Sequence, residues 1–193
     1  MSREGSPRPD QSPLFRRSAP PEPTQAGLVH GVAPLESRTR PGFFGPVALT
    51  RAVSPTMQAR GSGHVVVISS LLGELGMRGR SGYAASKHAL HGYFEPLQAE
   101  VRSIGIAVTL VRPGYIDTDL PLRALTGDGR SQGQRDGTHP RGMSPSACAA
   151  RILESIERRR EEVVIGGWET YAVSLKRLFP RLFARAISAY APT

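Results

Sequence analysis

The feature that most constrains the fold is an uninterrupted run of β-branched residues at 65–68, followed by a long predicted helix and a second apolar run. A continuous run of this kind is typical of a strand buried on both faces, as in a parallel sheet covered by helices. The helix is predicted over 83–103 and stops near Gly105, and the second strand is predicted over 106–111. Strand, helix and strand in this order predict an α/β protein with a parallel sheet.

Further elements are predicted on both sides of this unit. A helix is predicted over 42–58, closed by the glycines that follow it. Ser144 followed by Pro145 has the form of an N-cap before a proline at the first helical position, so a helix is predicted from there to Arg159. A short last strand is predicted over 162–165.

Three polar residues follow the first predicted strand. Lys87 stands four residues after Tyr83, so the two side chains share one face of the predicted helix. An ammonium group beside a phenol favours the phenolate, and we therefore expect the pKa of Tyr83 to lie below its usual value of about 10. Ser70 stands at the carboxyl end of the strand, where open α/β sheets hold their ligands. This grouping predicts proton transfer to or from a carbonyl or alcohol oxygen.

Tyr83, Lys87 and Ser70, with the run at 111–118, resemble the short-chain dehydrogenase/reductase family in order and spacing. The resemblance implies a Rossmann-like, doubly wound parallel sheet. It also implies that Tyr83 is the general acid/base, that Lys87 lowers the pKa of Tyr83 and binds the nicotinamide ribose, and that Ser70 orients and polarises the substrate oxygen.

The same resemblance implies cofactor contacts after the second strand. Ile116 and Thr118 match the family positions that contact the nicotinamide carboxamide, and they follow the turn at Pro113 and Gly114. These four residues, with Tyr83 and Lys87, form the predicted cofactor-binding set. The cofactor is expected to be NADP rather than NAD, and no metal site is predicted.

The chain also departs from the family pattern. Family members begin with a strand and a glycine-rich turn that holds the pyrophosphate, and the only candidate turn here, 27–33, lacks the third glycine and follows no predicted strand. The position of the family's relay asparagine is Gly42, and the chain contains no asparagine. We therefore expect an incomplete sheet, with the strand at 65–68 at or near an open edge. Whether 28–35 is the remnant of a family strand or a linker stays open.

The chain is accordingly divided into two parts. Residues 1–41 hold 8 of the 17 prolines and are predicted to be disordered, because such a segment buries too little apolar surface to fold. Residues 42–193 are predicted to be the catalytic half of the family fold, ending in an amphipathic helix. A frame-shift and a wrong start site are both open explanations for 1–41.

Charge and composition exclude several classes of protein. The net charge of +9 comes from 23 arginines and two lysines scattered along the chain, without the interleaved aromatic residues that bind nucleic acid. Cys148 is the only cysteine, so no internal disulfide forms, and its alanine neighbours predict a buried helical position. No stretch reaches the roughly 20 apolar residues of a membrane span, and a cytoplasmic location is expected.

The segment 168–190 alternates apolar and basic residues and contains Pro180. A basic amphipathic helix can lie on a membrane surface. Packing against its own domain or a second subunit is the favoured interpretation of this segment.

Two functions are therefore carried forward. The first is an NAD(P)-dependent oxidoreductase that interconverts a ketone and a secondary alcohol, and that is crippled if the cofactor-binding half is lost. The run at 113–129 resembles the branch that contains acyl- and alkyl-dihydroxyacetone phosphate reductase, which implies a lipid-like substrate and NADPH. The alternative is a non-catalytic truncated relative that acts through subunit association, and a homo-oligomer is expected in either case.

Overall fold

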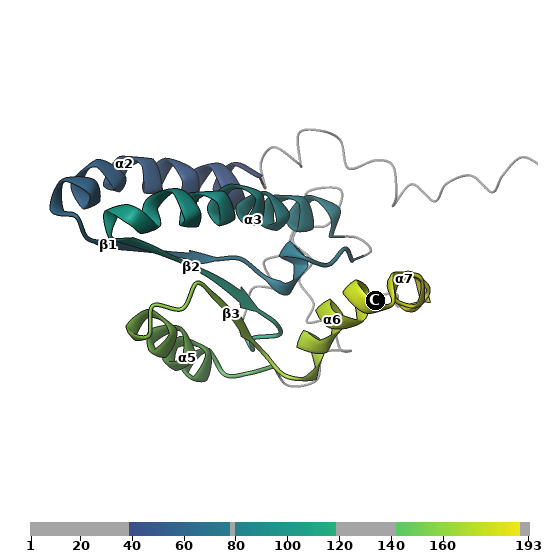
Figure 1. Ribbon diagram of the computed structural model, residues 1–193. Helices are drawn as coiled ribbons and strands as arrows, with labels where there is room; N and C mark the ends of the chain where they lie inside the picture. Colours follow the sequence, from purple (N-terminus) through teal and green to yellow (C-terminus); the bar gives the residue numbers. More distant parts are fainter. Residues whose placement is uncertain (1–38, 78–79, 119–141, 190–193) are drawn as a thin grey trace, which may run out of the picture.

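The computed structural model describes residues 39–77, 80–118 and 142–189, in which helices cover both faces of one sheet (Figure 1). The main elements, in chain order, are a π-helical turn at Arg40–Phe44, α2 (Gly45–Arg60), β1 (Gly63–Ile68), α3 (Ser81–Val101), β2 (Ile106–Pro113), α5 (Pro145–Glu157), β3 (Glu162–Ile165), α6 (Tyr171–Leu178) and α7 (Pro180–Ala189). Short 3₁₀ helices lie at Leu71–Gly73, Arg102–Ile104 and Trp168–Thr170.

The three described strands form a parallel sheet in the order β1-β2-β3. Ile68 lies opposite Val111 at the carboxyl end of β1, and Pro113 lies opposite Ile165 at the carboxyl end of β2. Helices α2 and α3 cover one face of the sheet, and α5 covers the other (Figure 1). The α/β fold with a parallel sheet, predicted from the alternation of strands and helices, is confirmed.

The core lies on both sides of β2. Leu90 and Phe94 of α3 are completely buried and belong to one cluster with Val67, Val108 and Leu110 of the sheet. On the other face, α5 contributes Cys148 to a second cluster with Val111 and Ile165. Cys148 is thus a buried helical residue, as its alanine neighbours predicted.

Strand β1 is less buried than expected. Its first four residues are half-buried and Ile68 is 46% exposed, whereas β2 is buried over most of its length. In the described part of the chain β1 pairs only with β2 and forms an edge of the sheet, which leaves one side of the strand uncovered. The expectation of burial on both faces is therefore wrong, and the expectation of an edge position is right for these residues.

Local signals place several element boundaries. The Ser144 hydroxyl accepts a hydrogen bond from the Ala147 amide at 3.2 Å, and Pro145 begins α5. Gly105 ends the turn after α3 with φ 78°, and a Cβ there would collide with the carbonyl oxygen of Gly61. The C-terminal segment is divided at Pro180 into α6 and α7. No helix in the described residues is both long enough and apolar enough to cross a membrane.

Candidate active site

The predicted catalytic residues lie together at the carboxyl end of β1. The Ser69 amide donates to the Val111 carbonyl at 2.8 Å, which continues the strand pairing up to Ser70. The Ser70 hydroxyl caps the following 3₁₀ helix by accepting from the Leu72 amide at 3.2 Å, and it is close enough to the Tyr83 hydroxyl to lower the pKa of that phenol. The structure thus brings Ser70 close to the first turn of α3, and the roles of these residues stay predictions.

Lys87 lies beside Tyr83 on α3. Its Nζ is 5.7 Å from the centre of the Tyr83 ring and donates a hydrogen bond to the Ile68 carbonyl at 2.9 Å. Burial lowers the pKa of Lys87. The ammonium group is thus fixed between α3 and the end of β1, with two of its three N–H donors left for another partner.

The electrostatic expectation for Tyr83 is not met. Burial raises the pKa of Tyr83, while the hydrogen bond from Ser70 and the charge of Arg80 act weakly in the opposite direction. The ammonium of Lys87 is not among the causes of this shift. The prediction of a lowered pKa is therefore wrong for the protein without cofactor, because loss of hydration outweighs the nearby charges. The phenol is protonated at neutral pH and is in the form that can donate a proton.

The predicted cofactor residues follow β2. Pro113 ends the strand, and the Gly114 amide donates to the Ile165 carbonyl at 2.7 Å. Ile116 forms an isolated parallel bridge with Met143. Thr118 lies exposed two residues farther along the chain.

The backbone of Ile116 is oriented by its neighbours. The Met143 amide donates to the Tyr115 carbonyl and the Asp117 amide donates to the Met143 carbonyl, both at 2.9 Å. In this pairing the N–H and C=O of Ile116 itself point away from Met143. A primary carboxamide, with one N–H donor group and one oxygen acceptor, is complementary to such a pair. These residues thus fit the nicotinamide end of a dinucleotide.

Glu169 supports the same loop and was not predicted. Its Oε1 accepts from the Tyr115 amide at 3.1 Å and from the Gly167 amide at 2.9 Å. A Cβ at Gly114 would collide with this carboxylate, so the glycine leaves room for it. Glu169 is 54 residues from Tyr115, and no local pattern in the sequence indicates the contact.

Gly42, at the position of the family's asparagine, lies against α3. A Cβ at Gly42 would be 2.9 Å from the hydroxyl of Ser86, which itself donates to the Tyr83 carbonyl at 2.8 Å. Ser86 is a buried residue of α3 and stands between Tyr83 and Lys87 in the sequence. A larger side chain at position 42 therefore requires Ser86 to move.

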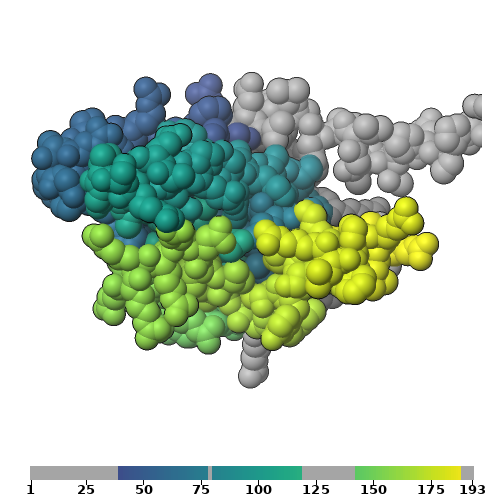
Figure 2. All heavy atoms as spheres, in the orientation of Figure 1, coloured from purple at the N-terminus to yellow at the C-terminus, as the bar shows by residue number. Residues whose placement is uncertain are grey.

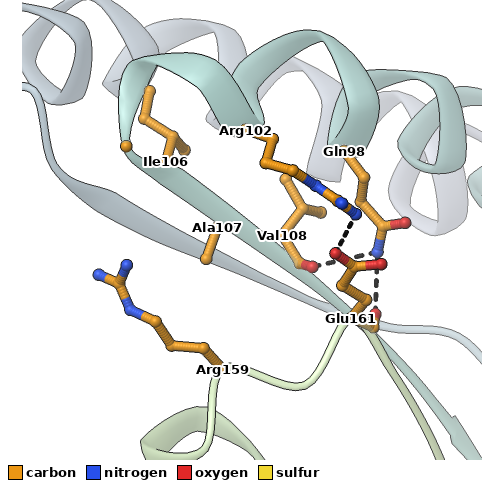
Figure 3. A pocket seen from close by; sticks show the side chains of 8 residues that line it. Gln98, Arg102, Ile106, Ala107, Val108, Arg159 and Glu161 are labelled. Atoms are coloured by element: carbon orange, nitrogen blue, oxygen red, sulfur yellow. Dashed lines mark hydrogen bonds and ion pairs between the residues drawn. The ribbon is translucent and has the colours of Figure 1, made fainter.

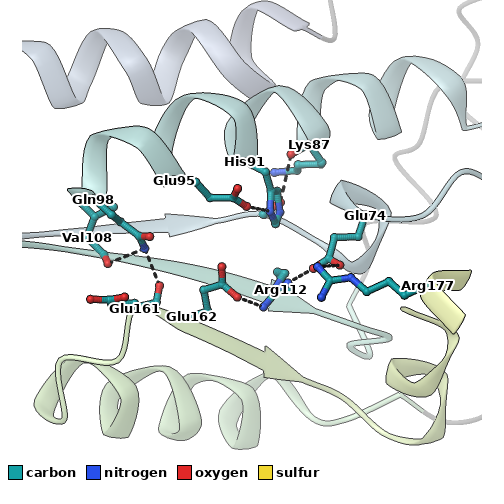
Figure 4. A network of polar contacts seen from close by, with 11 residues as sticks. Glu74, Lys87, His91, Glu95, Gln98, Val108, Arg112, Glu161, Glu162 and Arg177 are labelled. Atoms are coloured by element: carbon teal, nitrogen blue, oxygen red, sulfur yellow. Dashed lines mark hydrogen bonds and ion pairs between the residues drawn. The ribbon is translucent and has the colours of Figure 1, made fainter. Parts of the chain in front are cut away.

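A row of hydrogen-bonded polar side chains continues along α3 from Lys87 (Figure 4). His91 and Glu95 follow at intervals of four residues, and a hydrogen bond of 3.1 Å joins His91 Nδ1 to Glu95 Oε1. His91 Nε2 is 2.9 Å from the hydroxyl of Ser69, and both of these side chains are buried. The sequence shows the spacing along the helix but not the contact with Ser69. This chain ties α3 to the segment that presents Ser70.

We predict that Gly73→Ala disturbs this connection. A Cβ at Gly73 would lie 2.6 Å from both His91 Nε2 and Ser69 Oγ, so one of these buried groups must shift. The expected cost is about 1–3 kcal/mol in the free energy of unfolding, the range for overpacking a core. The matched control is Gly76→Ala, where a Cβ meets nothing within 4 Å. Equal stability of the two variants in urea unfolding would contradict the prediction.

Ionic contacts connect the loop after Ser70 with the rest of the site (Figure 4). Glu74 and Arg112 form a buried ion pair, and Arg112 also pairs with Glu162 of β3. From α6, Arg177 lies 3.4 Å from Glu74, and Lys176 donates to the Glu74 carbonyl. Helix α6 is therefore anchored to the loop that follows Ser70, at the carboxyl end of β1.

A hollow at the opposite end of the sheet is unrelated to this site (Figure 3). Gln98 donates from its side chain to the carbonyls of Val108 and Glu161, at 3.0 and 2.8 Å, and Arg102 pairs with the Glu161 carboxylate. Gln98, Arg102 and Glu161 thus bind one another, and the hollow lies beside Ile106, at the amino end of β2.

Comparison with known proteins adds independent evidence. Residues 38–126 match the family model described as short chain dehydrogenase. The chain is 44% identical over 150 residues to "Dehydrogenase/reductase SDR family member 7B" of Danio rerio, an alignment that covers 77% of this chain and 48% of the relative. A "Dehydrogenase/reductase SDR family protein 7-like" of Drosophila melanogaster is 44% identical over 142 residues, covering 73% of this chain and 44% of the relative. The chain spans about half the length of these curated relatives.

Solved structures show the same fold. A short-chain dehydrogenase from Streptomyces avermitilis is 31% identical with a TM-score of 0.61, and the match covers 80% of this chain and 60% of that one. A short chain dehydrogenase from Burkholderia cenocepacia, solved in complex with NADP, is 20% identical with a TM-score of 0.66 and coverage of 83% and 62%. The second likeness concerns the fold alone.

Proposed function

We propose that the chain is a nicotinamide-dependent oxidoreductase of the short-chain dehydrogenase type, which interconverts a ketone and a secondary alcohol, because residues 38–126 match the family model of that description. The observation that carries the proposal is the meeting of Ser70, Tyr83 and Lys87 at the carboxyl end of β1, where parallel sheets hold their ligands.

Each side chain has a distinct part in the proposed reaction. The Ser70 hydroxyl donates a hydrogen bond to the substrate oxygen and orients the carbonyl group. The Tyr83 phenol gives its proton to that oxygen, and burial keeps the proton on the phenol until then. The ammonium of Lys87 is held by the Ile68 carbonyl and offers its two remaining N–H donors to ribose hydroxyls. The bound nicotinamide supplies or accepts the hydride.

The finer parts of the proposal rest on resemblance. We propose NADPH in preference to NADH, and a lipid-like ketone as substrate, because the run at 113–129 resembles the branch that contains acyl- and alkyl-dihydroxyacetone phosphate reductase. Of this run, residues 119–129 lie outside the described part of the chain. The site residues and the cytoplasmic location stay predictions.

Subunit association is the second candidate. Helix α2 exposes Leu49 (67%) and Val53, and Phe44 just before the helix is also exposed. These apolar side chains support the proposal of a homo-oligomer that forms through this region. Association of this kind is compatible with catalysis, and it is the whole function in the non-catalytic alternative.

Cofactor binding distinguishes the two candidates. Isothermal titration with NADPH and NADH is expected to give micromolar affinity. Lys87→Ala is expected to weaken binding about tenfold or more, the effect of losing hydrogen bonds from a charged donor. His88→Ala is the control, because His88 is exposed on the same turn and bonds only the Ala84 carbonyl. If folded protein binds neither nucleotide, the oxidoreductase proposal fails and the association candidate replaces it.

A further inference from the structure

Helices α6 and α7 present large apolar side chains to solvent. Five residues of this region have more than half of their surface exposed, and we call them the C-terminal apolar face: Trp168 (70%), Tyr171 (75%), Leu178 (71%), Phe179 (58%) and Leu182 (55%). Tyr171 and Leu178 are seven residues apart, which is about two helical turns, so they lie on the same side of α6.

This face is separate from the side that packs on the protein itself. Phe183 of α7 is buried in a cluster with Leu71 and Leu75 of the loop after Ser70. Leu175 and Ile187 pack against the same cluster. The two helices form a lobe at one end of the molecule (Figure 2). One side of these two helices therefore packs on the rest of the protein, and a second apolar side stays exposed.

The net charge of the same region is positive. Its one acidic residue, Glu169, is half-buried and accepts hydrogen bonds from the amides of Tyr115 and Gly167. There is no acidic residue from 170 to 193, and the basic residues are Lys176, Arg177, Arg181 and Arg185. The first two contact Glu74. Arg181 and Arg185 are exposed and form no ion pair with any described residue. The surface thus combines exposed apolar groups with two uncompensated cations.

Exposed apolar side chains beside two exposed arginines indicate which kind of partner fits this face. In a two-fold dimer through this face, the same patch would meet itself, and Arg181 and Arg185 would face their own copies. The only acidic group there would be Glu169, which is half-buried and already bonded to two backbone amides. The surface of an anionic membrane offers hydrocarbon for the apolar groups and negative headgroups for the arginines. We propose that the C-terminal apolar face docks on anionic lipid bilayers, with α6 and α7 lying in the plane of the membrane surface.

The dimensions of the helices agree with this orientation. Helix α6 has 8 residues and α7 has 10, whereas a membrane-spanning helix needs about 20. Tryptophan and tyrosine are enriched at the level of the lipid headgroups, where their polar groups stay hydrated, and Trp168 and Tyr171 supply both types. This inference is independent of the oxidoreductase proposal, because it involves neither cofactor nor substrate.

Vesicle co-flotation tests the proposal with the full chain. The protein is expected to float with vesicles of phosphatidylcholine and phosphatidylserine, and not with phosphatidylcholine alone. Arg181→Gln with Arg185→Gln should lower the partition coefficient by about tenfold or more, from the contribution of basic residues near an anionic surface. Leu178→Ser with Leu182→Ser should lower it to a similar extent by removing buried apolar area.

The control variants are Arg151→Gln and Leu153→Ser, which replace exposed residues of the same types on α5. They should bind as the unaltered chain does, and circular dichroism should show unchanged helix content in every variant. The proposal is overturned if the folded protein does not bind vesicles that contain phosphatidylserine, or if both double variants have the same partition coefficient as the unaltered chain. It is also overturned if sedimentation shows a dimer that dissociates in the leucine double variant, while the unaltered chain does not bind vesicles.

Discussion

Tyr83→Phe is expected to lower the rate of NADPH-dependent carbonyl reduction by a factor of about 10² to 10⁴, the usual contribution of a general acid. The substitution removes the hydroxyl that is proposed to donate the proton and keeps the ring that lies beside the Lys87 ammonium. The effect should therefore fall on kcat, while the affinity for NADPH changes little. Consumption of NADPH with phenanthrenequinone as the carbonyl probe gives the rate, and titration gives the affinity.

Tyr93→Phe is the matched control on the same helix. The Tyr93 ring packs edge-on against Phe43 and Phe94, with ring centres 6.2 and 5.0 Å apart, so the substitution preserves the packing. Its activity should equal that of the unaltered chain. Full activity of Tyr83→Phe, or an equal loss in both variants, would show that the phenol of Tyr83 is not the proton donor.

Leu90→Ala is expected to lower the free energy of unfolding by about 2–5 kcal/mol, the range for removing a buried leucine side chain. Leu90 is completely buried, in the cluster where α3 packs on β1 and β2. The loss combines the transfer of apolar surface with the cavity left between helix and sheet. Urea unfolding followed by circular dichroism measures the difference.

Leu153→Ala is the control for this prediction, because it makes the same change on α5 at a residue that is 60% exposed. Its effect should stay within about 0.5 kcal/mol, as for most surface substitutions. A similar loss in both variants would mean that α3 does not pack on the sheet as described.

Local patterns predicted the elements of this fold well. The run at 162–165 was predicted from its apolar residues and coincides with β3 (Glu162–Ile165). Ser144 and Pro145 begin α5 where the capping pattern placed its start. The proximity of Ser70 to Tyr83 was implied by the resemblance of their spacing to the short-chain dehydrogenase/reductase family, because local patterns place Ser70 at a strand end and Tyr83 on a helix but do not bring the two together.

Properties that depend on distant residues were not predictable. The exposure of Ile68 depends on which strands flank β1, and the strand order is a property of the whole sheet. The pKa of Tyr83 is raised because surrounding elements exclude water, and the spacing of Tyr83 and Lys87 contains no information on burial. The contact of Glu169 with Tyr115 likewise joins residues that only the folded chain brings together.

The unit of β1, α3 and β2 has a consequence for the order in which the protein assembles. Ser70 and Lys87 are separated by only 16 intervening residues, and both lie between two strands that pair directly, Gly63 with Ile106 at one end. Closing so short a loop costs little chain entropy. During synthesis these groups emerge from the ribosome before α5, α6 and α7, and domains generally fold in units as they appear. The three residues of the proposed proton transfer thus lie in one contiguous stretch of sequence. The segments before and after this stretch can change in evolution without separating Ser70, Tyr83 and Lys87.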